Sequence, residues 1–182
     1  MVGAVSCVAF GLALLSAEGD LNVLGPLGSL SVPGGAPSAQ ASERVPAQML
    51  ALYRQAAPTC PGLPWTVLAA IGTVESSNGT SDLPGVHSGA NYAGAEGPMQ
   101  FEPATFAEYD DPVPPGGSRP PSPYNPVDAV YAATRLLCAN GAAGGSDIPA
   151  AVFTYNHSES YVTEVLSVAQ SFGSGDSAGA SG

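Results

Sequence analysis

The chain has 182 residues and a formal net charge of −11, with 15 acidic side chains against four basic ones, all of them arginine. A surface of this sign repels phosphate backbones and anionic lipids, so nucleic-acid binding is not expected. Hydrophobic residues make up 45% of the chain and charged residues 10%, which is enough to build a packed core. Gly and Pro gather at both ends and in residues 112–126. Without the two ends, about 130 residues remain, the size of one domain.

The N-terminal segment 1–17 has no charged side chain and is strongly apolar over residues 5–15. A membrane span needs about 20 such residues. The run resembles the apolar part of a signal peptide, without the usual basic residues before it. We therefore expect export to an extracytoplasmic location, with residues 1–17 acting as a signal peptide or as a membrane anchor.

The segments on either side of the domain are rich in Gly, Ser, Ala and Pro. This composition predicts a flexible linker over residues 18–41 and a disordered tail over residues 173–182. The folded domain is expected to span residues 42–172 and to be a monomer.

The domain is predicted to be mainly helical, because apolar residues recur at helical spacing and no convincing alternating strand is present. The first helix should begin between Ser42 and Val45 and end at Pro58. The second should run from Pro64 to a left-handed turn at Asn78-Gly79.

Helix-start signals then mark four later helices. A short helix is expected from Pro103 to Tyr109, and a long one from the Asn125-Pro126 pair to Cys138. Two more should follow, one over residues 149–155 and one from residue 158. Any β-structure is expected to be a small hairpin within residues 81–92.

Two of the three cysteines, Cys60 and Cys138, lie in the predicted domain, and Cys7 lies in the N-terminal apolar run. Two cysteines in an exported domain predict one disulfide. Such a bridge would stabilise the fold by roughly 4–5 kcal/mol in the chain-entropy description. The alternative is two unpaired cysteines that are buried as small hydrophobic side chains.

Glu75 stands at the end of the second predicted helix, directly after the apolar residues Leu68, Ile71 and Val74. A carboxyl group beside an apolar stripe loses hydration, and a helix C-terminus adds partial negative charge, so both effects should raise its pKa. A raised pKa suits a general acid that works near neutral pH. An exposed glutamate at a helix end is the alternative.

Three segments occur in a fixed order: TVESSNG at Thr73–Gly79, GAEGPMQF at Gly94–Phe101 and FTYNHSESYVTEVL at Phe153–Leu166. Together they resemble the superfamily of lytic transglycosylases and goose-type lysozymes. A fourth segment, YNPVDAVYAATRLLC at Tyr124–Cys138, is similar to the helix that follows in actinobacterial members. The resemblance covers about residues 45–172 and implies a lysozyme-like fold with a substrate cleft.

The resemblance implies a role for each matching residue. Glu75 corresponds to the glutamate that protonates the glycosidic oxygen, and Ser76 is expected to orient that carboxyl or a substrate group. The Met99-Gln100 segment is expected to line the sugar cleft, and Tyr155 to hydrogen-bond the catalytic glutamate. The implied substrate-binding residues are Ser76, Met99, Gln100, Tyr155 and Asn156.

The implied substrate is the peptidoglycan glycan strand, cleaved at the β-1,4 bond between N-acetylmuramic acid and N-acetylglucosamine. Similar enzymes use one glutamate, and the substrate's own 6-hydroxyl closes a 1,6-anhydro ring. One alternative is a hydrolytic muramidase, in which Asp110 or Asp111 positions a water molecule. The other is a peptidoglycan-binding or assembly module without catalytic activity. The expected role of both aspartates is to end the preceding helix.

The two histidines, His87 and His157, have no metal-ligand spacing, so neither a metal nor another cofactor is expected. Glu96 and Glu102 flank the Met99-Gln100 segment where similar proteins have small or apolar residues. They are interpreted as solvated surface, with an influence on substrate binding as the alternative. Three tyrosines could stack on sugar rings or pack in the core: Tyr92, Tyr109 and Tyr124.

Overall fold

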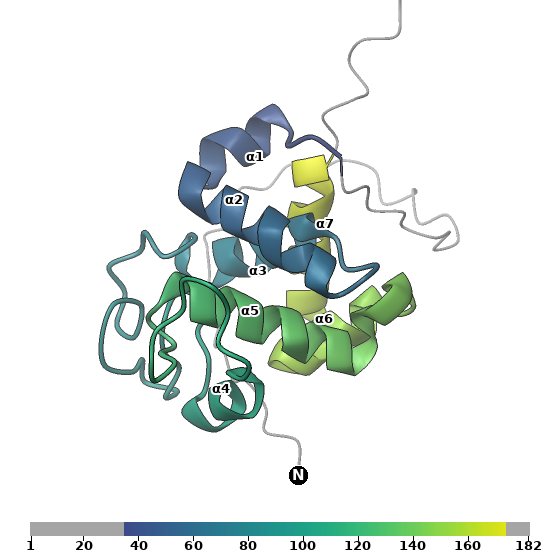
Figure 1. The fold of residues 1–182 in the computed structure, drawn as a ribbon. Helices are drawn as coiled ribbons and strands as arrows, with labels where there is room; N and C mark the ends of the chain where they lie inside the picture. The colour runs from purple at the N-terminus through teal and green to yellow at the C-terminus, as the bar shows by residue number, and fades with distance from the viewer. Residues whose placement is uncertain (1–34, 174–182) are drawn as a thin grey trace, which may run out of the picture.

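The computed structural model describes residues 35–173, which form an assembly of α-helices and confirm the predicted mainly helical class (Figure 1). The helices are α1 (Ala39–Arg44), α2 (Ala47–Ala56), α3 (Trp65–Ser76), α4 (Pro103–Tyr109), α5 (Pro126–Leu137), α6 (Ile148–Asn156) and α7 (Glu159–Gly173). Short 3-10 turns or π-helical turns follow α2 and α5. Among these residues the only β pairing is an isolated antiparallel bridge between Glu96 and Phe101. The small hairpin expected within residues 81–92 does not form there, because that stretch is a series of turns and bends.

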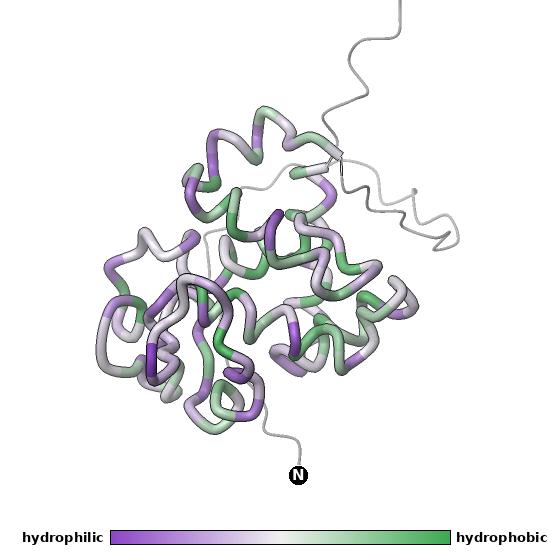
Figure 2. The backbone as a smooth tube through the Cα atoms, in the orientation of Figure 1, coloured by the Kyte–Doolittle hydropathy of each residue, from purple (hydrophilic) through white to green (hydrophobic). Residues whose placement is uncertain are grey.

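Helix α3 forms the centre of the core. Its residues from Trp65 to Gly72 are all buried, on every face of the helix. A helix that is apolar all round is stable only when other elements surround it. Helices α2, α5 and α7 contact α3 (Figure 1), and the hydrophobic stretches of the chain concentrate where these helices meet (Figure 2). The core therefore encloses the helix that carries Glu75 at its C-terminal end.

The folded part begins earlier than residue 42. Residues 39–41, which the composition assigned to the linker, form the first turn of α1. Ser38 caps this helix by accepting a hydrogen bond from the Ala41 N–H, and its own N–H donates to the Phe172 carbonyl. Ala41 is fully buried, and the Arg44 guanidinium lies over the Phe172 ring. Helix α1 is thus attached to the end of α7, which a composition rich in small residues does not reveal.

The predicted helix starts are confirmed where a local capping signal defines them. Helix α4 begins at Pro103, and α5 begins after Asn125, whose side chain accepts from the Val127 N–H. Asp147 caps α6 by accepting from the Ala150 N–H. The left-handed turn that ends α3 begins at residue 77, one residue before the predicted position, and continues through residues 78 and 79.

Cys60 and Cys138 form the expected disulfide, with 5.6 Å between their Cα atoms. The bridge joins the turn before α3 to the end of α5. Within residues 35–173 no helix combines the length and the apolar character needed to cross a membrane. The predicted signal peptide or anchor, the first part of the linker and nearly all of the tail lie outside the described residues.

Candidate active site

The Glu75 side chain projects from the last turn of α3 and is half-buried. The Tyr161 hydroxyl, from the first turns of α7, donates a hydrogen bond of 2.6 Å to Glu75 Oε1. Tyr161 itself is only 4% exposed, so its ring is fixed by packing. The carboxyl group is therefore held in one orientation by a buried partner.

Two tyrosines lie parallel beside this carboxyl group. The Tyr155 and Tyr161 rings are stacked with 6.4 Å between their centroids and an interplanar angle of 6°. The Tyr155 hydroxyl donates to the Met99 carbonyl at 2.7 Å. Through this pair, α6 and α7 are connected both to Glu75 and to the segment that was expected to line the cleft.

Ser76 links the C-terminal end of α3 to that same segment. Its hydroxyl donates to the Pro98 carbonyl at 2.6 Å and accepts from the Gly79 N–H at 2.7 Å. Its side chain is 2% exposed. Ser76 thus ties the turn after α3 to the segment that contains Met99 and Gln100 by hydrogen bonds inside the protein.

Met99 and Gln100 are buried in the structure. Met99 is 0% exposed and belongs to the core, and Gln100 is 4% exposed with a left-handed φ of 49°. The Gln100 amide donates to the Gly97 carbonyl at 2.8 Å and accepts from the Asn91 side chain at 2.9 Å. With these contacts, both side chains support the segment from inside the protein. The resemblance had predicted that they line the sugar cleft.

Two loops pack against this segment at Gly97. The Gly97 N–H donates to the Gly85 carbonyl at 2.7 Å, which brings in the 81–92 loop. A Cβ atom at residue 97 would lie 1.8 Å from the Pro123 carbonyl oxygen, so only glycine allows the 110–124 loop to come this close. The 81–92 and 110–124 loops are thus both fixed to the segment that contains Met99 and Gln100.

Asp128 of α5 holds the second of these loops, residues 110–124, by hydrogen bonds. One carboxylate oxygen accepts from the N–H groups of Ser118 and Ser122, at 2.9 and 3.0 Å. Asp128 is 1% exposed, so its carboxylate is part of the domain interior. It fixes the 118–122 turn relative to α5.

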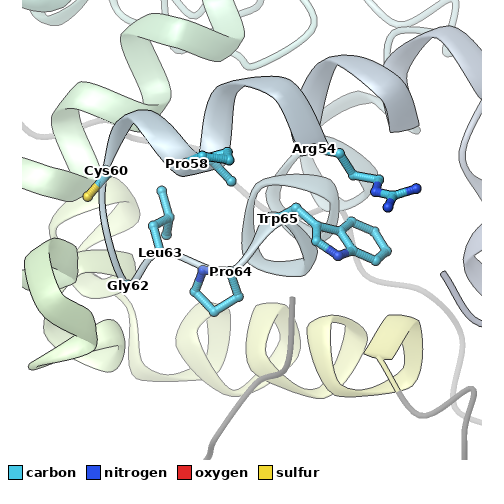
Figure 3. A pocket seen from close by; sticks show the side chains of 8 residues that line it. Arg54, Pro58, Cys60, Gly62, Leu63, Pro64 and Trp65 are labelled. Carbon is cyan, nitrogen blue, oxygen red and sulfur yellow. The ribbon is translucent and has the colours of Figure 1, made fainter. Parts of the chain in front are cut away.

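A hollow of about 370 Å³ lies at the opposite end of α3 (Figure 3). Its lining includes Arg54, Pro58, Leu63, Pro64 and Trp65. Because α3 rises about 1.5 Å per residue, the ten residues from Trp65 to Glu75 separate the two regions by roughly 15 Å. This hollow is therefore distinct from the Glu75 site.

The sequence profile of the Transglycosylase SLT domain family matches residues 53–175, two thirds of the chain. The chain belongs to this family. The match spans Glu75, the Met99-Gln100 segment and both stacked tyrosines, and it confirms the resemblance to lytic transglycosylases. The family consists of lysozyme-like enzymes that cleave the glycan of peptidoglycan. No curated protein and no solved structure gives a significant match to the chain.

Within this SLT domain, Asp110 and Asp111 lie directly after α4. Asp110 follows the last residue of α4, and the Arg135 guanidinium donates to the carbonyls of Tyr109 and Pro112 on either side of the aspartate pair. Burial lowers the pKa of Arg135, and the charges of Asp111 and Asp110 oppose that change. Arg135 of α5 therefore holds the backbone at the end of α4 through these two carbonyls.

Glu96 is half-buried and lies beside the Tyr124 phenol. Desolvation raises the pKa of Tyr124, and the Glu96 carboxylate adds to this rise. The Tyr124 hydroxyl also donates to the Gly89 carbonyl. Glu96 is thus part of the contact between the two loops, which the interpretation as solvated surface did not include.

Asn156 is the last residue of α6 and is half-buried. Within residues 35–173 no cluster of His, Cys, Asp or Glu could hold a metal ion.

Sequence reasoning missed Tyr161 as a site residue and assigned it to the apolar face of the last helix. The relevant signal is the hydroxyl, since a buried tyrosine usually finds a hydrogen-bond partner. Its partner is 86 residues away in the chain, so helical spacing alone could not identify it.

Tyr161→Phe removes only the hydroxyl that holds Glu75. We expect kcat on peptidoglycan to fall by about tenfold, because a loosely held carboxyl spends less time in the productive orientation. KM should stay within about twofold, because the ring and the cleft are unchanged. Steady-state kinetics check this, with Tyr131→Phe on α5 as the control. If Tyr161→Phe has the same kcat as the wild type, the Tyr161 hydroxyl does not contribute to the orientation of Glu75 in the reaction.

Proposed function

We propose that this chain is a peptidoglycan lytic transglycosylase in which Glu75 is the single acid/base. The observation that carries the proposal is the half-buried Glu75 carboxyl, held by Tyr161 at the end of a buried helix. The bond that the enzyme would cleave is the β-1,4 link between N-acetylmuramic acid and N-acetylglucosamine. Ser76, Met99, Gln100, Tyr155 and Asn156 are proposed to build and position the cleft around that bond.

The reaction needs one proton donor that later becomes a proton acceptor. Protonated Glu75 gives its proton to the glycosidic oxygen as the bond from the muramic acid C1 to that oxygen breaks. The substrate's N-acetyl group stabilises the resulting cationic sugar. The Glu75 carboxylate then takes the proton of the 6-hydroxyl as O6 bonds to C1, which closes the 1,6-anhydro ring. Glu75 ends the cycle protonated, and no water is consumed.

The proposed mechanism needs only one carboxylate. Enzymes that hydrolyse glycosides with inversion use a second carboxylate, roughly 6.5–9.5 Å from the first, to activate water. Asp110 and Asp111 lie at the end of α4 near Arg135 of α5. In this setting the charges of both aspartates act on the Arg135 guanidinium. Because peptidoglycan lies outside the cytoplasm, the proposal also implies an extracytoplasmic location.

The test is mass spectrometry of purified peptidoglycan after digestion by the protein. Muropeptides about 18 Da lighter than their hydrolysed counterparts, the mass of one water, would support the transglycosylase reaction, whereas enzymes that use a water nucleophile give reducing ends. Reducing-end products would contradict the proposal in favour of a hydrolytic muramidase. The absence of any product would favour a binding or assembly module.

A further inference from the structure

A buried polar network joins α2 to the turn at the end of α3. Asn78 is 3% exposed, and its side-chain oxygen accepts from the Tyr53 hydroxyl at 3.0 Å. Its side-chain nitrogen donates to the Thr73 hydroxyl at 3.0 Å. Tyr53 is 0% exposed, and burial raises the pKa of its phenol, so the hydroxyl remains a neutral donor. Because both groups are inside the protein, loss of either would leave the other without its partner.

The backbone at this point is held in an unfavourable conformation. Ser77 and Asn78 both have left-handed φ values, 53° and 61°, followed by Gly79 at 79°. Few non-glycine residues adopt this region, and asparagine enters it more readily than most. The Asn78 N–H also donates to the Gly72 carbonyl at 2.7 Å. Asn78 therefore closes the last turn of α3 through both its backbone and its side chain.

The network also requires a glycine in α3. A Cβ atom at Gly72 would lie 2.0 Å from the Tyr53 hydroxyl oxygen and 3.1 Å from the Asn78 side-chain oxygen. The same tyrosine hydroxyl lies 4.0 Å from the Met99 sulfur. The Tyr53-Asn78 pair thus contacts α2, the last turns of α3 and the segment next to the site.

We propose that Asn78 is a positioning residue for Glu75, acting with Tyr53 to set the last turn of α3 and the direction of the carboxyl group. Glu75 lies between Thr73, which Asn78 binds through its side chain, and the left-handed turn that Asn78 forms. A change in that turn rotates the carboxyl group away from Tyr161. The inference rests on the proposed function, because it concerns how well Glu75 performs its proton transfers.

The experiment compares kcat and KM on peptidoglycan for residues 1–182 and for Asn78→Gly, Tyr53→Phe and the double variant. Glycine keeps the left-handed backbone without strain, so Asn78→Gly removes only the side-chain contacts. We expect kcat to fall on the order of tenfold in Asn78→Gly and by a smaller factor in Tyr53→Phe, with KM within about twofold. The double variant should lose little more than Asn78→Gly alone, because the two residues act as a unit.

The control is Thr134→Val, which removes a buried hydroxyl that donates to the Val130 carbonyl within α5. It should lower the melting temperature without lowering kcat at a temperature at which every variant is folded by circular dichroism. Wild-type kcat in both single variants would overturn the inference, as would losses that multiply in the double variant. If Asn78→Gly does not fold, Tyr53→Phe tests the inference by itself: a reduced kcat supports it, and a wild-type kcat overturns it. A wild type that gives no product would overturn the proposed function instead.

Discussion

Glu75→Gln is expected to lower kcat on peptidoglycan by about a thousandfold, the contribution typical of a positioned proton donor and acceptor. The amide has nearly the shape of the carboxyl group, but it cannot supply a proton to the glycosidic oxygen. Its oxygen can still accept the hydrogen bond that Tyr161 donates to Glu75 Oε1. The fold should therefore remain, with a melting temperature within about 2 °C of the wild type.

Product analysis by mass spectrometry and a thermal melt of the same sample check this expectation together. Glu159→Gln is the matched control, because Glu159 is exposed in the first turn of α7, two residues from Tyr161. The control should keep wild-type activity. A Glu75→Gln protein that still cleaves glycan would show that another group is the acid, and the proposed mechanism would be wrong.

Removing the disulfide with the Cys60→Ala/Cys138→Ala double variant is expected to destabilise the domain by roughly 4–5 kcal/mol, because the bridge closes a long loop. The two cysteines are 78 residues apart in the chain. For a domain of this size the melting temperature should fall by roughly 15 °C. Activity well below that temperature should persist, since Cys60 lines the hollow at the end of α3 opposite Glu75.

Thermal melts of both proteins with and without a reducing agent are the measurement. The reducing agent should lower the melting temperature of the wild type and leave the double variant unchanged. Two thiols that react with a thiol reagent in unreduced, exported protein would contradict the disulfide.

Features that depend on neighbours in the chain could be predicted from the sequence. Asn125 and Asp147 cap the helices that follow them, because a cap bonds N–H groups only two or three residues ahead. Pro103 starts α4 for an equally local reason, since its fixed φ suits the first turn of a helix. The position of Glu75 at a helix end follows from the apolar run before it, and the family motifs selected it as the acid.

Features that depend on contacts between distant segments needed the tertiary structure. Tyr161 reaches Glu75 because α7 packs along α3. Met99 is buried in the core that distant helices form, and Gln100 is held by Asn91 of the preceding loop. Helix α1 is attached to the end of α7, although its first three residues, 39–41, were assigned to the linker. The sequence by itself determined where helices α4, α5 and α6 begin, because capping and the fixed φ of Pro103 act within a few residues, and the family motifs selected the candidate acid. The packing of α3 against α7 decided which hydroxyl holds that carboxyl, because a hydrogen bond between side chains 86 residues apart exists only once the helices are in contact.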